Sequence, residues 1–349
     1  MIYINARFLT QDMTGVQRFA AELCLQLAGL RDDVIFLSPR DIKQVDIASR
    51  LNVKVVGSRS GHLWEQWDLP FFLRKNGCPL LVNLGNTAPL LYLNKVITLH
   101  DISYLRYPKT YSWGFRYCYK FFIPLLLKTC KKLLTVSDFS RDEICSQYGF
   151  SREKIHIIHN AVSEKFTGAH KTGLRRGYFL AVSSHHYHKN FHGLLAAFNK
   201  LPEKYEMHMI VAGSTHPNYQ PLEFDKNLGN KVSFVGRVSD EELVDLYRNA
   251  FCFLFPSLYE GFGLPPLEAQ ACGCPVIASN ATAMPEVLGE SAILVDPLND
   301  DALTEAMEKL VLDPKLRESL IAAGTENIER FSWLLSARQL SCVIDSVSV

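Results

Sequence analysis

Two glutamates, Glu260 and Glu268, enclose a loop rich in glycine and proline. The segment reads EGFGLPPLE and lies between two apolar runs that are predicted as strands. Its glycines let the backbone approach a ligand closely, and its prolines are tolerated where a helix begins. The N–H groups of a first helical turn favour phosphate, whereas ionised carboxylates accept hydrogen bonds from hydroxyls. The pattern indicates a nucleotide-sugar site; the alternative is an ordinary βαβ unit with two surface carboxylates.

The segment from Phe255 to Pro297 resembles the glutamate–seven residues–glutamate signature of glycosyltransferase family 4. The similarity extends through the flanking strands to PEVLG and LVDP. Members of this family are retaining enzymes of the GT-B architecture. The resemblance implies that Glu268 holds the ribose hydroxyls and that Glu260 faces the transferred sugar. It also implies donor contacts from the backbone N–H groups of Phe262, Gly263 and Leu264.

His100 and Asp101 end a predicted strand that reads VITLH. The resemblance implies that His100 lies beside the donor sugar, where its carbonyl or side chain supports positive charge at the anomeric carbon. Asp101 would orient the imidazole or meet the acceptor. A purely structural histidine at a strand end is the alternative.

Lys189 follows the strand YFLAV within the sequence SSHHYHKN. In the family that this chain resembles, an arginine several residues before a Lys-Asn pair joins the lysine in neutralising the donor diphosphate. Lys189 matches the pattern, but Ser184 stands where the arginine is expected. His186, His188 and Arg237 are candidates to compensate.

A metal site is an alternative use of the histidines after this strand. His185, His188 and His192 are spaced by three and four residues, but structural zinc is usually closed by four ligands and no cysteine lies nearby. An Asp-x-Asp motif is also missing from the sequence. We therefore expect a metal-independent enzyme with no cofactor.

Two further loops carry donor-binding candidates. Gly15 lies before the predicted helix Phe19–Ala28 and suits close contact with phosphate or acceptor; the alternative is a plain helix start capped by Thr14. Arg237 and Val238 belong to the sequence FVGRV, which resembles the family segment whose backbone binds the nucleobase.

Short apolar runs alternate with helical patterns along the chain, which predicts an α/β protein with parallel, doubly wound sheets. The predicted strands are Ile2–Asn5, Val34–Ser38, Val53–Val56, Leu80–Leu84, Val96–His100, Leu133–Val136, Ile155–Ile158, Tyr178–Ser183, His208–Ala212, Val232–Val235, Phe251–Phe255, Pro275–Ala278 and Ala292–Val295. Two such series predict two Rossmann-like domains, and the GT-B resemblance implies that their sheets face across a cleft. We place an acceptor domain at residues 1–165 with a terminal helix of about 333–349, and a donor domain at 172–332.

Bulk composition narrows the class of protein. The 349 residues are 48% hydrophobic, which is enough for two cores, and the net charge of +1 argues against a nucleic-acid partner. Nine cysteines without a CxxC pair indicate reduced thiols. The first residues lack the features of a signal peptide and no apolar run could cross a membrane, so we expect a cytoplasmic protein. Residues 113–134 mix aromatics with lysines, which suits either a core-facing helix or peripheral contact with the inner face of the bacterial inner membrane. Pro124 interrupts this pattern, which argues against one long helix.

The expected function is transfer of a hexose from a GDP-sugar or UDP-sugar to a hydroxyl of a glycan or lipid-linked acceptor. The resemblance to bacterial polysaccharide and lipopolysaccharide mannosyltransferases makes mannose the first choice. One alternative is a sugar-nucleotide-binding protein without activity. Another is a nicotinamide-dependent dehydrogenase, although the only GxGxx candidate ends in Pro266 and comes late in the chain.

Overall fold

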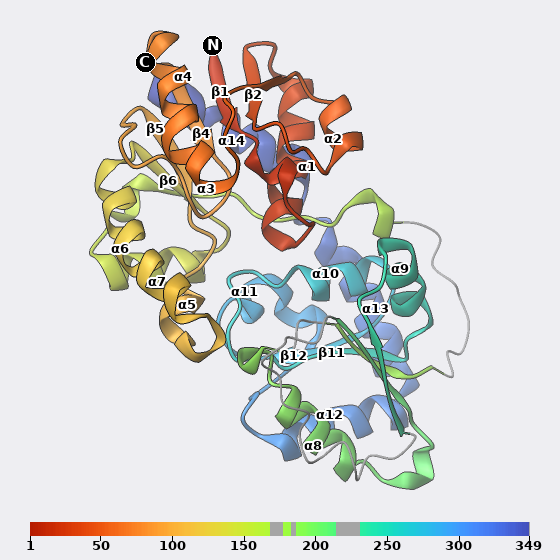
Figure 1. The fold of residues 1–349 in the computed structure, drawn as a ribbon. Coiled ribbons are helices and arrows are strands. Elements are labelled where there is room, and N and C mark those ends of the chain that lie inside the picture. Colours follow the sequence, from red (N-terminus) through yellow and green to blue (C-terminus); the bar gives the residue numbers. More distant parts are fainter. Residues whose placement is uncertain (168–176, 183–185, 214–230, 349) are drawn as a thin grey trace. The chain divides into compact units, whose positions relative to one another are not determined.

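The computed structural model describes residues 1–167, 177–182, 186–213 and 231–348. The chain divides into two compact units (Figure 1). Unit 1 comprises residues 1–106, 111–160 and 332–349, and unit 2 comprises residues 107–110 and 161–331. The predicted domain boundary, between residues 165 and 172, includes residues that the structure does not describe, so it stays a prediction.

Unit 1 is built on a seven-stranded parallel sheet with the strand order β3-β2-β1-β4-β5-β6-β7. All residues of β1, β4 and β5 are buried, as expected for a parallel sheet covered on both faces. The strands are β1 (Ile2–Asn5), β2 (Val34–Ser38), β3 (Val53–Val55), β4 (Leu80–Asn83), β5 (Lys95–Thr98), β6 (Lys132–Thr135) and β7 (Ile155–Ile157).

The described helices of unit 1 include the last helix of the chain, which packs on the first. Phe19 meets the ring of Trp333 edge-on at 6.1 Å between centroids, and Arg31 pairs with Asp345 at 2.6 Å. The helices are α1 (Gly15–Leu30), α2 (Val45–Ser49), α3 (Gly61–Leu63), α4 (Leu69–Lys75), α5 (Ser103–Arg106), α6 (Trp113–Thr129), α7 (Asp138–Tyr148) and α14 (Trp333–Ser348), with a π-helix, η2 (Trp64–Asp68), between α3 and α4.

Helix α6 passes through Pro124, where the sequence led us to expect an interruption. A proline inside a helix removes one backbone hydrogen bond and crowds the preceding turn. Burial of Ile123, Leu126 and Leu127 in the core of unit 1 supports the helix on both sides of the proline. The expectation of a break at Pro124 was therefore wrong, because packing outweighs the local cost.

A buried lysine fixes the loop that follows β4. Lys95 is fully buried, and its Nζ donates to the carbonyls of Pro89 and Tyr92 at 3.0 and 2.7 Å and to Thr129 Oγ1 at 2.9 Å. Burial lowers the pKa of Lys95 to about 8. These hydrogen bonds tie the loop to β5 and to the end of α6.

Unit 2 contains a six-stranded parallel sheet with the order β10-β9-β8-β11-β12-β13. Its core is formed by the sheet together with the apolar faces of α8 and α12. The strands are β8 (Phe179–Val182), β9 (Met209–Ala212), β10 (Val232–Gly236), β11 (Cys252–Phe255), β12 (Val276–Ser279) and β13 (Ile293–Val295). The described helices are α8 (Phe191–Lys200), α9 (Asp240–Asn249), α10 (Leu264–Ala271), α11 (Met284–Leu288), α12 (Asp300–Leu312) and α13 (Pro314–Ile328).

The predicted fold class is confirmed, because both sheets are parallel and doubly wound. All thirteen predicted strands are present, with ends that differ by up to two residues. In each sheet the strand order reverses beside the first strand of the unit, between β1 and β4 in unit 1 and between β8 and β11 in unit 2. Ligands of such sheets bind beyond the carboxyl ends of the strands at this reversal.

Candidate active site

Lys189 and Glu260 meet beyond the carboxyl ends of β8 and β11, where the sheet of unit 2 reverses. The two residues are 71 positions apart in the chain, and Lys189 Nζ lies 2.6 Å from Glu260 Oε1. Their side chains are 17% and 12% exposed. The pair is thus largely sheltered, but it still reaches the edge at which a ligand would bind.

The turn that carries Lys189 is held on both sides. Asn190 adopts a left-handed conformation with φ of 57°, caps α8, and donates from Nδ2 to the Pro297 carbonyl at 2.6 Å. On the other side, the carbonyl of His188 accepts from the backbone N–H of Leu258 at 2.7 Å. These contacts fix the Lys189 backbone against the loop that leads to Glu260.

His188 is a neutral neighbour of this ion pair. Burial, followed by the positive charge of Lys189 and the nearby His186, lowers the pKa of His188 to about 3. A neutral imidazole cannot neutralise a diphosphate, so the structure gives no support to His188 as the replacement for the family arginine. Ser184, at the arginine position, and His185 lie outside the described residues.

The loop before α10 requires glycine at position 263. Gly263 has a φ of 90°, and a Cβ there would lie 2.1 Å from Met284 Cε. The first N–H groups of a helix have no partner inside it, and Pro265 and Pro266 carry no N–H. The prolines thereby restrict the amide donors at the start of this helix to Gly263 and Leu264.

Glu268 lies on α10 and is 6% exposed. The Tyr247 hydroxyl donates to Glu268 Oε2 at 3.4 Å, and burial, followed by the charge of Glu268, raises the pKa of Tyr247 well above its usual value. Tyr247 therefore remains a protonated donor. Phe262 is buried and packs edge-on against Phe331, with 5.4 Å between ring centroids.

Arg237 and Val238 follow the last strand residue of β10, Gly236. The Arg237 residue is exposed and Val238 is half-buried. The Gly236 carbonyl accepts from the backbone N–H of Gly213 at 2.7 Å, which links the ends of β9 and β10. Both predicted nucleobase-binding positions thus lie just beyond a strand end of the same sheet.

The remaining predicted residues belong to unit 1. His100 is buried, and its Nε2 lies 3.0 Å from the Leu84 carbonyl, which makes Nε2 the protonated nitrogen. Burial lowers the pKa of His100, so the ring is neutral. Asp101 Oδ1 accepts from the backbone N–H of Ser103 at 2.8 Å at the start of α5, and Gly15 is the first residue of α1.

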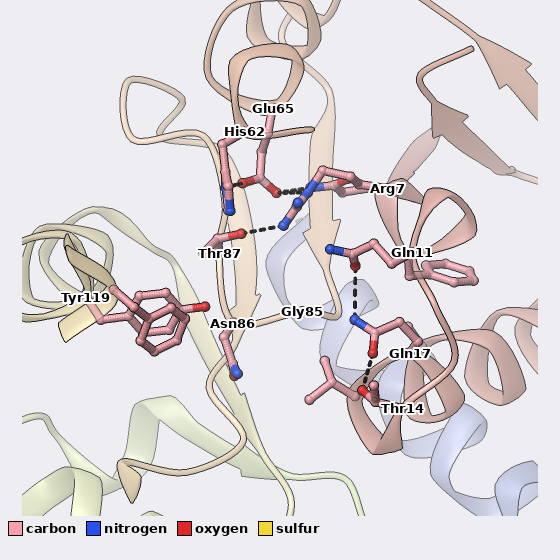
Figure 2. A pocket seen from close by; sticks show the side chains of 15 residues that line it. Arg7, Gln11, Thr14, Gln17, His62, Glu65, Gly85, Asn86, Thr87 and Tyr119 are labelled. Atoms are coloured by element: carbon pink, nitrogen blue, oxygen red, sulfur yellow. Dashed lines mark hydrogen bonds and ion pairs between the residues drawn. The ribbon is translucent and has the colours of Figure 1, made fainter. Parts of the chain in front are cut away.

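A polar pocket that the sequence analysis missed lies in unit 1 where its sheet reverses, beyond the ends of β1 and β4 (Figure 2). Its volume is about 270 Å³. The register aligns Asn5 with Asn83, and their side chains hydrogen-bond at 3.0 Å. The pocket is lined by charged, amide, hydroxyl and aromatic side chains, among them Arg7, Gln17, Glu65, Asn86, Thr87 and Tyr119.

No three side chains of His, Cys, Asp or Glu among the described residues are grouped to hold a metal ion. Within the same residues, every helix is too short or too polar to cross a lipid bilayer.

Solved structures with the same architecture cover nearly the whole chain. Sucrose-phosphate synthase from Thermosynechococcus elongatus matches with a TM-score of 0.75 at 18% identity, covering 99% of this chain and 98% of that one. Anabaena Alr3699/HepE in complex with UDP and glucose matches with a TM-score of 0.71 at 20% identity, covering 99% of both chains. These matches establish the fold, which is that of the GT-B glycosyltransferases.

Sequence comparison gives the family. Residues 13–166 match the family described as Glycosyltransferase Family 4, and residues 163–327 match Glycosyl transferases group 1. O-antigen chain mannosyltransferase B of Escherichia coli is 34% identical, covering 92% of this chain and 93% of that protein. O-antigen chain mannosyltransferase RfbU of Salmonella typhimurium is also 34% identical, over 66% of this chain and 64% of the relative.

The chain therefore belongs to glycosyltransferase family 4, with a group 1 domain in its second half. The predicted family and the predicted enzyme class, a glycosyltransferase, are confirmed. The dehydrogenase alternative was wrong, because the glycines and prolines before α10 belong to the group 1 domain.

Proposed function

We propose that this enzyme transfers mannose from a nucleoside diphosphate sugar, GDP-mannose first, to a hydroxyl of a glycan or lipid-linked acceptor in bacterial surface polysaccharide synthesis. The observation that carries the proposal is the sheltered Lys189–Glu260 pair at the reversal of the unit 2 sheet. The names of the two mannosyltransferase relatives supply the sugar and the pathway class.

The residues of unit 2 suit the parts of such a donor. The ammonium of Lys189 has three protons, so it can bind a phosphate oxygen while it holds Glu260. The amide donors of Gly263 and Leu264 add partial positive charge at the helix start. The carboxylates of Glu260 and Glu268 would accept hydroxyls of the hexose and the ribose, respectively.

We propose a retaining, metal-independent reaction. The bond from the anomeric carbon to the diphosphate oxygen breaks, and a bond to the acceptor oxygen forms on the same face. The acceptor proton passes to the departing phosphate. Catalysis then depends on positioning and on stabilisation of the leaving charge by Lys189 and the amides, which are effective because they are in place before the reaction.

A panel of GDP-, UDP- and ADP-sugars tests the donor. We expect GDP-mannose to raise the melting temperature most, because a ligand at about 100 times its Kd adds roughly 2.7 kcal/mol to the free energy of unfolding. Transfer should persist in EDTA, and NMR of the product should show the anomeric configuration of the donor. Stabilisation by a donor without hydrolysis or transfer to any acceptor would instead favour a sugar-nucleotide-binding protein.

We also propose that α6 contacts a membrane surface. Trp113, Tyr117 and Phe121 recur every fourth residue and are 71%, 55% and 65% exposed. Exposed Lys120 and Lys128 lie on the same helix. A helix with aromatic and basic side chains on its surface can lie in a lipid interface.

Sedimentation with vesicles that contain anionic lipid tests this contact. Replacing Trp113 and Phe121 together with serine should lower the bound fraction at least severalfold, because both aromatic side chains would otherwise enter the interface. Leu312→Ser is the matched control, since Leu312 is 64% exposed on α12 of unit 2. Equal binding of all three proteins, or none by the unaltered protein, would refute the contact.

A further inference from the structure

Glu65 lies in the π-helix η2, and hydrogen bonds hold both ends of this helix. The Trp64 indole is fully buried and donates to the Val56 carbonyl at 2.7 Å. At the other end, Asp68 Oδ2 accepts from two backbone N–H groups of the preceding loop, each at 2.8 Å. Single π-helical turns inside α-helices frequently occur at functional sites. This turn places Glu65 in the wall of the unit 1 pocket (Figure 2).

The charges in the pocket compensate each other. Glu65 is 1% exposed, and its Oε1 accepts from Asn5 Nδ2 at 2.8 Å and from Arg7 Nε at 3.3 Å. Arg7 Nη2 also donates to Thr87 Oγ1 at 3.0 Å. Burial opposes ionisation of Glu65, but His62, Arg7 and the hydroxyl of Thr87 together hold the pKa of its carboxyl below the usual value. A carboxylate and a guanidinium in contact favour a ligand without net charge.

The second oxygen of Glu65 has unused accepting capacity. Oε2 is buried, and no donor among the described residues reaches it with good hydrogen-bond geometry. His62 Nδ1 lies 3.4 Å from Oε2, on a side chain that is 65% exposed. A buried polar atom without a good hydrogen bond destabilises the folded protein, because it has lost its water. A hydroxyl donor entering the pocket would remove that destabilisation.

The rest of the pocket suits a single sugar ring. Phe115 and Tyr119 stack with 4.0 Å between ring centroids and form an aromatic wall, against which the C–H face of a pyranose can pack. The amides of Gln17 and Asn86 line the pocket and can both donate and accept. The volume of about 270 Å³ is below the roughly 300–1,000 Å³ of sites for drug-sized ligands.

We propose that this pocket binds one neutral sugar ring, the end of the glycan that receives the hexose, with Glu65 accepting a hydrogen bond from a ring hydroxyl. The inference rests on the proposed function, because a second sugar site is needed only if a sugar is transferred to a glycan. It adds the acceptor class, an uncharged sugar, and the residues that recognise it.

Gly85 offers a way to block the pocket without disturbing its polar network. It lines the pocket, and a Cβ added there meets no atom within 4 Å. Gly85→Leu would therefore fill part of the cavity, and Glu65→Gln would remove the carboxylate at constant size. Gly29→Leu is the matched control, because Gly29 is exposed near the end of α1 and a Cβ there also meets nothing within 4 Å.

Calorimetric or NMR titration of the full chain with methyl α-D-mannopyranoside, in the presence of GDP, measures the site directly. We expect binding to the unaltered protein and to Gly29→Leu, and affinities at least tenfold lower in Gly85→Leu and Glu65→Gln. Mannose 6-phosphate should bind more weakly than the neutral sugar. The affinity for GDP should be the same in all four proteins, because unit 2 is unchanged.

Three results would overturn the proposal: no binding of the methyl sugar to the unaltered protein at millimolar concentrations, equal affinity in Gly85→Leu, or a preference for the phosphorylated sugar. Failure of the proposed function has a different signature. It would appear as a lack of stabilisation by every nucleotide-sugar, whereas the titration with methyl mannoside needs no donor.

Discussion

Glu260→Gln should lower kcat/KM for sugar transfer at least 100-fold, which corresponds to about 2.7 kcal/mol of transition-state stabilisation. The change keeps the size of the side chain but removes the charge that holds Lys189 at 2.6 Å. Lys189→Ala should cause a loss of similar size, because the leaving diphosphate would then meet no side-chain cation from this turn. Steady-state kinetics with the donor found in the nucleotide-sugar panel measure both losses.

Thermal unfolding separates this catalytic role from a structural one. Removing one member of a sheltered ion pair leaves the other uncompensated, so each single variant should melt earlier than the double variant. Transfer should remain lost in the double variant. Asp301→Asn is the control, since it breaks the exposed Lys200–Asp301 pair of the same unit and should change neither property. Transfer by Glu260→Gln within a few-fold of the unaltered enzyme would contradict the assignment.

Gly263→Ala should both destabilise unit 2 and abolish transfer. The backbone φ of 90° is strained for any residue with a Cβ, and that Cβ would lie 2.1 Å from Met284 Cε. Strain and overpacking together predict a loss of about 2–4 kcal/mol in the free energy of unfolding. Denaturant unfolding measures the loss, and donor titration shows whether the start of α10 still binds phosphate.

Two further variants separate the two causes of the effect of Gly263→Ala, which are the clash with Met284 and the backbone strain. Met284→Ala, added to Gly263→Ala, removes the clash and should recover part of the stability but not the transfer. Gly77 has a φ of 84° with nothing within 4 Å of an added Cβ, so Gly77→Ala reports backbone strain alone. If Gly263→Ala is no more destabilising than Gly77→Ala, the close packing against Met284 has no energetic weight.

The strands were predictable because a buried parallel strand is a short, nearly continuous apolar run between polar segments. The runs YFLAV and FCFLF, for example, became β8 and β11 with small changes at their ends. Pro124 was misjudged for the converse reason. A local rule predicted a break, but the packing of α6 against residues far along the chain decided the outcome.

The candidate site was predictable only where its chemistry is local in sequence. The glycines and prolines lie within a few residues of the start of α10, so they predict both that start and its amide donors. Contact between Lys189 and Glu260 could not be predicted from their types, since only the sheet topology brings them together. The structure adds that the Asp101 carboxylate accepts a hydrogen bond from the N–H of Ser103, whereas the expected role of Asp101 beside His100 or the acceptor stays a prediction.

The pocket of unit 1 was missed because its central carboxylate depends on an irregular helix. Hydrophobic periodicity does not distinguish a π-helical turn from an α-helix, and the turn decides which side of the helix Glu65 occupies. One signal was available: Glu65 and Asp68 are acidic residues inside the aromatic run WEQWD. Both are buried, which is uncommon for carboxylates without a specific partner.

The packing of α14 on α1 has a consequence for biosynthesis. Unit 1 includes the last residues of the chain, 332–349, whereas the main segment of unit 2, residues 161–331, is continuous. A ribosome releases residues in order, so nascent unit 2 is complete while α1 still lacks the helix that covers Phe19. Until residues 332–349 have been made, the surface of α1 around Phe19 is uncovered, and chaperones or premature aggregation would act on the nascent chain at that stage.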